Sequence, residues 1–290
     1  MDVALVTCSR LKDLDPDDRC LLEALPARGL SVGVRVWDDP AVDWGEARLT
    51  LIRSPWDYHL RLPEFLAWAE RASRASRLVN PLPVVRWNTH KGYLRDLARR
   101  GADVVPTEYV PAGVPFDLRR RLEALGWTRA VVKPAVSCDS YGTVGVDLSS
   151  KASLSAAQAH VDALSLEREL MVQPYLPAIA DPGERSLVFI EGELSHAVRK
   201  RSLFQGGRWA GPEGVPVEPQ GDEIAAARRA LEASGHHPQL YARVDLVRDE
   251  AGRPVLLELE LVEPTLFLSE VPEGRERLVD GIVARLEGRG

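Results

Sequence analysis

The chain has 290 residues, 45% of them hydrophobic and 28% charged, an ordinary globular composition that allows one large domain or two to three smaller ones. Its net charge of −6 provides no broad basic surface, so we expect no nucleic-acid partner. No apolar run approaches the ~20 residues of a membrane-spanning helix. The three cysteines lack CxxC spacing, which argues against a disulfide framework or zinc site, so a cytoplasmic protein without a membrane partner is expected.

The first part of the chain alternates strand-like and helix-like segments. The apolar runs that predict strands are residues 3–8, 31–37, 48–54 and 77–81. Helical stripes occupy residues 18–30, where Pro26 should end the helix, and 63–73. Alternation of this kind predicts a parallel α/β sheet, in a first domain of residues 1–87.

Two α+β units are predicted to follow, at 88–176 and 177–290. The second unit should contain helices at 89–101, 116–126 and 155–167 and strands at 104–110, 129–135 and 169–177. The third should contain hairpins at 186–200 and 241–261 and helices at 221–235 and 275–286. Residues 204–221, rich in Gly and Pro, are a candidate lid or a plain surface loop.

An unusual concentration of acid occurs in LLELELVEPTL, residues 256–266. Side chains alternate along a strand, so Glu258 and Glu260 should share one face, while Leu257, Leu259 and Leu261 point into a core. A plain alternative is a solvated strand face whose acids lie in water.

A hairpin with the preceding strand sharpens this question. The turn residues at 249–252 predict a hairpin centred on Ala251 and Gly252, which places Asp245 directly opposite Glu258. Opposed like charges destabilise a sheet unless a cation lies between them. Mg²⁺ prefers carboxylate oxygens and often bridges them to phosphates, so the hairpin is a candidate magnesium site.

A second informative stretch is VVKPAVSCDSYGTVGV, residues 131–146. A strand delivers Lys133, and the loop that follows offers small residues, Ser137, Ser140 and Gly142, that can fold over phosphates. The loop lacks the P-loop pattern, and a hairpin loop with a solvated lysine is the alternative. Lys91 and several arginines on nearby strands could likewise bind phosphate or simply form salt bridges.

Taken in order, these segments resemble the ATP-grasp carboxylate–amine ligases over roughly residues 88–270, with an N-terminal α/β domain before them. The order is Lys91, Lys133 with its loop, QPYLPAI, ERSLVFIEGELSHAVRK, RVDLV and ELELVEPT. The stretches MVQPYLPAI and GERSLVFIEGEL are especially similar to bacterial glutathione synthetases. The motif RSPWDYH and the run HAVRKRSLFQGGRW are most similar to relatives in small-molecule biosynthesis, such as the cyclo-ligase that closes O-ureido-D-serine into D-cycloserine.

The resemblance implies a role for each matching residue. Residues implied to bind ATP are Lys91, Lys133, Ser137, Ser140, Gly142, Gln173, Tyr175 and Leu176, with Asp181 or Glu184 on the ribose. Two Mg²⁺ ions are implied to bind Asp245, Glu258 and Glu260. Catalytic cations are implied at Arg199, Lys200 and Arg243, and arginines near the substrate at Arg185 and Arg208. The family often has Asn in place of Glu260, which makes this metal site more acidic. Glu263 has no assigned role and is a candidate capping or substrate residue.

The acceptor side is predicted from the fold. Ligands of open α/β sheets bind beyond the carboxyl ends of the strands. The residues that follow one such strand are Arg53, Ser54, Trp56, Asp57, Tyr58 and His59. They could form a substrate wall, or a loop anchored by a buried Trp and an ion pair.

The predicted function is therefore an ATP-dependent ligase that joins carbon to nitrogen on a small amino-acid-like substrate, through a phosphorylated intermediate. A kinase on the same fold and a non-catalytic nucleotide-binding module are the alternatives. A homo-oligomer is what the resemblance implies for assembly.

Overall fold

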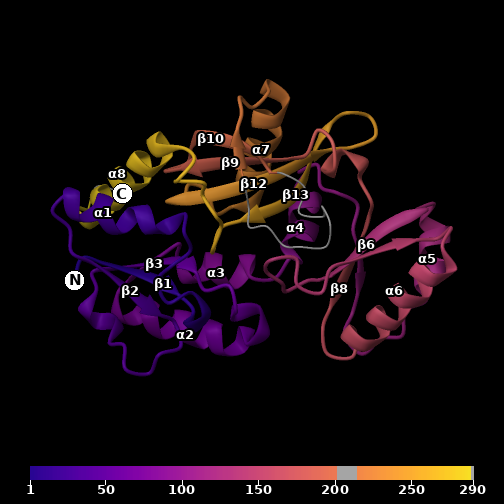
Figure 1. The fold of residues 1–290 in the computed structure, drawn as a ribbon, viewed down its shortest axis with the longest axis horizontal. Coiled ribbons are helices and arrows are strands. Elements are labelled where there is room, and N and C mark those ends of the chain that lie inside the picture. Colours follow the sequence, from indigo (N-terminus) through magenta and orange to yellow (C-terminus); the bar gives the residue numbers. More distant parts are fainter. Residues whose placement is uncertain (201–213, 289–290) are drawn as a thin grey trace.

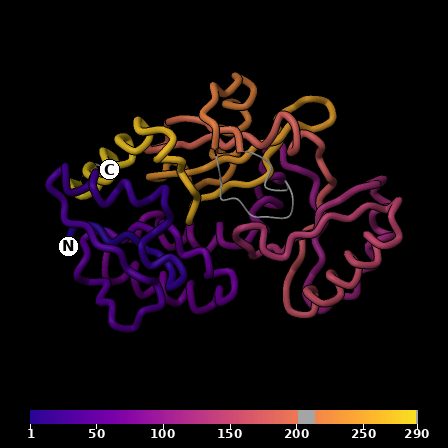
Figure 2. The backbone as a smooth tube through the Cα atoms, in the orientation of Figure 1, coloured from indigo at the N-terminus to yellow at the C-terminus, as the bar shows by residue number. Residues whose placement is uncertain are grey.

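The computed structural model describes residues 1–200 and 214–288. Three sheets follow one another along the chain, and Figures 1 and 2 show them side by side. Within the described residues no helix is long and apolar enough to cross a membrane. The cytoplasmic location stays a prediction.

The first sheet is parallel, as the alternating pattern predicted, with strand order β2–β1–β3–β4. Its strands are β1 Val3–Thr7, β2 Val32–Val36, β3 Leu49–Ser54 and β4 Arg77–Val79. Its helices are α1 Leu21–Ala27, which ends one residue after Pro26, and α2 Leu62–Ala75. Helix α2 buries Phe65, Trp68, Ala69 and Ala72, the helical spacing that seats one face on a sheet.

Two short helices, α3 Leu82–Asn88 and α4 Tyr93–Arg99, lead out of this sheet. The sequence predicted one helix over 89–101 and missed α3. Lys91 was placed in the helix and instead lies in the turn before α4, where its N–H donates to the carbonyl of Ala135 at 2.7 Å. This contact fixes Lys91 against the second sheet.

The second sheet is antiparallel in every pairing, with order β5–β8–β6–β7. Its strands are β5 Glu108–Val110, β6 Arg129–Pro134, β7 Val144–Asp147 and β8 Leu170–Pro174, and its helices are α5 Leu118–Leu125 and α6 Lys151–Leu164. The predicted cap Asp117 accepts the N–H of Arg120 and so begins α5. Lys133 lies near the end of β6, and the phosphate-loop candidate begins directly after this strand.

The third sheet is also antiparallel, with order β11–β10–β9–β12–β13. Its strands are β9 Glu184–Ile190, β10 Glu193–Lys200, β11 Gly214–Pro216, β12 Tyr241–Arg248 and β13 Pro254–Glu260. Helix α7 Gly221–Ser234 comes between β11 and β12 in the chain. The β9–β10 turn falls at Glu191 and Gly192, both with positive φ, as a tight hairpin turn requires. Of the candidate lid 204–221, residues up to 213 lie outside the described part, while β11 and the start of α7 are ordered elements.

The acidic hairpin has the predicted register at its key position. Asp245 lies opposite Glu258, but the register then shifts, so that Leu246 pairs with Leu256. This bulge makes Leu257 the extra residue on β13. Leu257 was predicted to point into the core and instead lines the cavity on the carboxylate face, whereas Leu256 and Leu259 pack in the core.

The last helix, α8 Pro272–Leu286, begins three residues earlier than predicted, with Pro272 in its first turn. It packs on α1, β9 and β10, so the C-terminal residues return to the first sheet (Figure 1). Arg28 on the loop after α1 pairs with Asp280 of α8 at 2.6 Å. Strands β1 and β3, together with β9 and β10, share one core cluster with this helix. Domain boundaries after residues 87 and 176 stay predictions.

Candidate active site

A cavity of about 310 Å³ is lined by residues of the second and third sheets and of the segments next to them, and by Trp56 from the loop after β3. The predicted site residues that line it are Trp56, Lys91, Lys133, Ser137, Ser140, Gln173, Tyr175, Leu176, Glu184, Lys200, Arg243, Asp245, Glu258, Glu260 and Glu263. Segments more than 200 residues apart in sequence, at Trp56 and Glu263, thus meet in one place, which a solvated strand face would not require.

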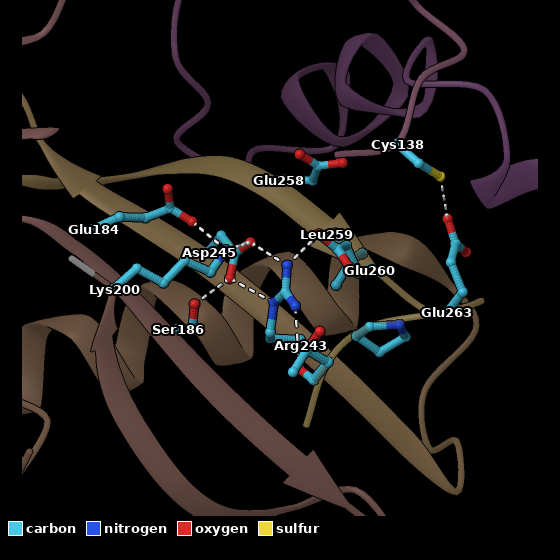
Figure 3. Close-up of polar contacts among 12 residues, drawn as sticks. Cys138, Glu184, Ser186, Lys200, Arg243, Asp245, Glu258, Leu259, Glu260 and Glu263 are labelled. Atoms are coloured by element: carbon cyan, nitrogen blue, oxygen red, sulfur yellow. Dashed lines mark hydrogen bonds and ion pairs between the residues drawn. The ribbon is translucent and has the colours of Figure 1, made fainter. Parts of the chain in front are cut away.

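Asp245 is the most heavily bonded acid of the site (Figure 3). Arg243 binds it in bidentate fashion at 2.9 Å, Lys200 pairs with it at 2.7 Å, and the hydroxyl of Ser186 donates to it at 2.6 Å. Burial alone would raise the pKa of Asp245, but the charges of Arg243 and Lys200 outweigh it and hold the pKa below its usual range. Asp245 is therefore an ionised carboxylate.

Glu258 and Glu260 follow on the neighbouring strand. The ammonium group of Lys91 lies 2.8 Å from Glu258, and although burial opposes it, the charges of Lys91 and Lys133 lower the pKa of Glu258. Glu260 pairs with Arg243, yet burial raises its pKa to about 8. In the described part of the chain, no three acidic, histidine or cysteine side chains are already gathered into a metal site. The carboxylates are instead engaged by basic neighbours.

The phosphate-loop candidate lines the same cavity through Ser137 and Ser140. Lys91 donates to the carbonyl of Ser137 at 2.8 Å, which ties the loop to the turn before α4. Lys133 forms no ion pair among the described residues, and burial lowers its pKa. Gly142 does not line the cavity. Its φ of +67° and the Pro134 ring, 2.9 Å from where a Cβ would sit, explain why the loop turns on a glycine there.

The hinge candidates form an apolar niche at one end of the cavity. Tyr175 and Leu176 line it together with Val131 and Ile179. The side chain of Gln173 donates to Thr107 at 2.9 Å and is fixed by that contact. Asp181 and Glu184 were the two acids predicted as possible contacts of the ATP ribose.

Of those two acids, Glu184 lines the cavity and Asp181 does not. Glu184 is paired with Lys200 at 2.5 Å.

Two predicted arginines face away from the cavity. Arg199 and Arg185 pair across β10 and β9, one residue from the cavity-lining pair Lys200 and Glu184, so the alternation of a strand turns them to the α7 face. Arg185 lies 3.7 Å from Glu223 of α7. The structure thus corrects the expected placement of Arg199 and Arg185 in the site. Arg208 lies outside the described residues.

Of the predicted substrate residues, Trp56 and Glu263 line the cavity. Arg53 is 0% exposed, and it binds Asp18 at 2.8 Å and the carbonyl of Pro264 at 2.8 Å. The hydroxyl of Ser54 bonds to Thr7.

Asp57 and Tyr58 are used within the fold as well. Asp57 accepts the indole N–H of Trp37, and Tyr58 packs on Phe65 in the core. Arg53, Ser54 and Asp57 therefore support the wall from behind, because each makes its polar contacts within the fold.

Several lining residues were not assigned by sequence reasoning. Thr265 and Asp139 line the cavity, and Ser186 bonds to Asp245 behind it. Ser186 could have been found, since it lies two residues after Glu184 on the same face of a strand. Cys138 also lines the cavity, and burial raises the pKa of its thiol, which makes it a poor nucleophile.

Comparison with known proteins agrees with this geometry. Residues 3–80 match the sequence profile of the N-terminal domain of D-cycloserine synthetase DcsG. The cycloserine biosynthesis protein DcsG of Streptomyces lavendulae is 36% identical, over 98% of this chain and 99% of that protein. A crystal structure of D-cycloserine synthetase DcsG has a TM-score of 0.91 at 35% identity, covering 99% of this chain and 100% of that one.

A more distant neighbour shares the fold alone. The RimK-domain ATP-grasp protein of Sphaerobacter thermophilus has a TM-score of 0.68 at 20% identity, and 99% of each chain is covered. The fold and the cavity therefore define an ATP-grasp ligase. The sequence identity to DcsG narrows this class to one family, and the chain belongs to the DcsG family.

Proposed function

We propose that this chain is an ATP-dependent ligase that closes a carbon–nitrogen bond within a small amino-acid-like substrate, converting O-ureido-D-serine into D-cycloserine. In this reaction a carboxylate oxygen takes the terminal phosphoryl group of ATP and ADP leaves. A nitrogen of the same molecule then attacks the activated carbonyl carbon, and phosphate leaves with the carboxylate oxygen. The nitrogen loses a proton to complete the bond, and the carbamoyl group that this nitrogen carries is lost by hydrolysis as carbon dioxide and ammonia, which leaves D-cycloserine.

One observation carries the proposal: Asp245 and Glu258 oppose each other on adjacent strands, in a cavity that also presents Lys91, Lys133 and Arg243. Carboxylate oxygens are the ligands that Mg²⁺ prefers, and like charges on adjacent strands favour a site that binds cations. Asp245, Glu258 and Glu260 fit Mg²⁺ by this donor chemistry. When bound, Mg-ATP would supply the phosphoryl group together with the positive charge that neutralises these acids.

The basic residues of the chain have separate parts in this proposal. Lys91 and Lys133 bind phosphate oxygens, and the loop that Lys91 anchors at Ser137 keeps water from the transferring group. Arg243, fixed by two bonds to Asp245, presents its guanidinium where negative charge develops. The protein thus acts by positioning and by electrostatic stabilisation.

The apolar niche lined by Tyr175, Leu176 and Ile179 is the place for the adenine ring. Trp56 and Glu263, at the side of the cavity next to the first sheet, are the place for the substrate. Glu184 remains the candidate for the ribose. Arg199 and Arg185 are left out of the proposal because they lie on the α7 face.

The test is release of ADP and phosphate with Mg-ATP across amino acids and ureido-amino acids. Both products appearing with O-ureido-D-serine, together with D-cycloserine, would support the proposal. ADP without phosphate would indicate a kinase. Bound ATP without turnover on any compound would favour a nucleotide-binding module.

A further inference from the structure

Glu263 differs from the other acids that line the cavity. Each of the others has a basic partner within 4 Å: Asp139 pairs with Arg10, Glu184 with Lys200, Asp245 with Lys200 and Arg243, Glu258 with Lys91, and Glu260 with Arg243. Among the described residues Glu263 has no such partner. Its carboxylate accepts from the thiol of Cys138 at 3.3 Å (Figure 3), a neutral donor, and the neutral hydroxyl of Tyr58 lies near it.

The backbone around Glu263 is held from the first sheet. The indole N–H of Trp56 donates to the carbonyl of Glu263 at 3.1 Å, and buried Arg53 donates to the next carbonyl, that of Pro264, at 2.8 Å. Asp17 accepts the N–H of Leu266 at 3.1 Å. A carboxylate on a segment fixed at three successive points is positioned before any ligand arrives.

The charges of the cavity are complementary to an amino acid bound beside ATP. Lys133 is a cation without an ion-pair partner among the described residues, on the side where phosphate is proposed to bind. Glu263 is an anion without one, on the side of Trp56. Burial raises the pKa of Glu263, which is the expected effect on a carboxylate that lacks a cation, and an ammonium group would reverse it.

We propose that Glu263 binds the ammonium group of the amino-acid substrate and makes the site select amino acids over acids that lack the amine. This inference rests on the proposed function and adds the recognition of the amine. D-cycloserine retains a free amino group, so the ammonium is not consumed and can stay on Glu263 during ring closure. Binding there would fix the orientation of the substrate carboxylate toward the basic side of the cavity.

The experiment compares two substrates on four proteins. The substrates are O-ureido-D-serine and its desamino counterpart, in which hydrogen replaces the amino group, and phosphate release is measured with Mg-ATP. The proteins are the native chain, Glu263→Gln, Glu263→Asp and the control Glu250→Gln, an exposed acid in the turn of the same hairpin. The KM for ATP, measured in each variant, shows whether the cavity is intact.

We expect Glu263→Gln to lower kcat/KM for the amino substrate ~10- to 100-fold, the range of a charge-assisted hydrogen bond. The desamino substrate should react equally with native protein and Glu263→Gln, and Glu263→Asp should recover part of the loss. Equal losses on both substrates, or none on either, would overturn the inference. If Glu263→Gln turns over neither substrate, calorimetric binding of O-ureido-D-serine with a non-hydrolysable ATP analogue decides, and unchanged affinity refutes the inference.

The two proposals fail in different ways. Turnover of O-ureido-D-serine with no preference over its desamino counterpart removes the role of Glu263 and leaves the ligase in place. If the native protein acts on a different amino acid, the same comparison with that compound and its desamino counterpart still decides the role of Glu263. Silence of the native protein on all compounds refutes the proposed function and this inference with it.

Discussion

Replacing Glu258 by Gln removes one negative charge from the site at nearly constant shape. The amide oxygen can still accept from Lys91, whose ammonium lies 2.8 Å from the carboxylate, so the fold and the turn before α4 should persist. The lost charge is one of three that face the same part of the cavity. Removing a single preorganised electrostatic group typically costs about 3–4 kcal/mol in the transition state, or a 10²–10³-fold fall in kcat.

The assay for this variant is steady-state release of phosphate, with the urea unfolding curve as a check on folding. We expect the free energy of unfolding of Glu258→Gln to lie within about 1 kcal/mol of the native value. The hydrogen bond from Lys91 survives in this variant, and a single hydrogen bond contributes energy of that order. Glu250→Gln, in the exposed turn of the same hairpin, should match the native protein in both measurements. Turnover of Glu258→Gln within about threefold of native would refute the metal-binding role, since that corresponds to less than ~1 kcal/mol.

Three further outcomes follow from the same structure. Tyr241→Phe should lower the free energy of unfolding by about 1–3 kcal/mol, because the buried hydroxyl lies within 2.9 Å of two carbonyl oxygens; a urea midpoint equal to native would contradict this. Burial, with the nearby charges of Asp17 and Asp18, raises the pKa of Cys20 to about 12. Only the thiolate reacts, so alkylation of Cys20 at pH 8 should be roughly a thousandfold slower than that of a free thiol and should rise with pH beyond 10; a plateau near pH 9 would show an ordinary pKa. Chelating Mg²⁺ with EDTA should abolish phosphate release and excess Mg²⁺ should restore it, whereas activity that survives EDTA would argue against the metal.

Much of the site could be predicted because it rests on local patterns. The turn residues at 249–252 and the alternation of a strand place Asp245 opposite Glu258, which the structure confirms. The same rule failed one position away, at Leu257. A bulge inserts an extra residue there, and bulges carry no clear signal in a single sequence.

The remaining errors come from long-range contacts. Arg53 was placed at the substrate because it follows a strand end, but its partners Asp18 and Pro264 lie 35 and 211 residues away in sequence. Arg199 and Lys200 are adjacent cations, and only their pairing on the sheet decides which one faces the cavity. Lys91 was expected in a helix, and the contact of its N–H with Ala135, the residue directly after β6, holds it in a turn instead.

The central claim is that the substrate carboxylate is activated by phosphoryl transfer before the carbon–nitrogen bond forms. The most direct test uses O-ureido-D-serine labelled with ¹⁸O in both carboxylate oxygens, with Mg-ATP, followed by mass spectrometry of the released phosphate. The account predicts one ¹⁸O atom in each phosphate and one retained in the carbonyl of D-cycloserine. Phosphate without ¹⁸O, released together with D-cycloserine, would contradict it.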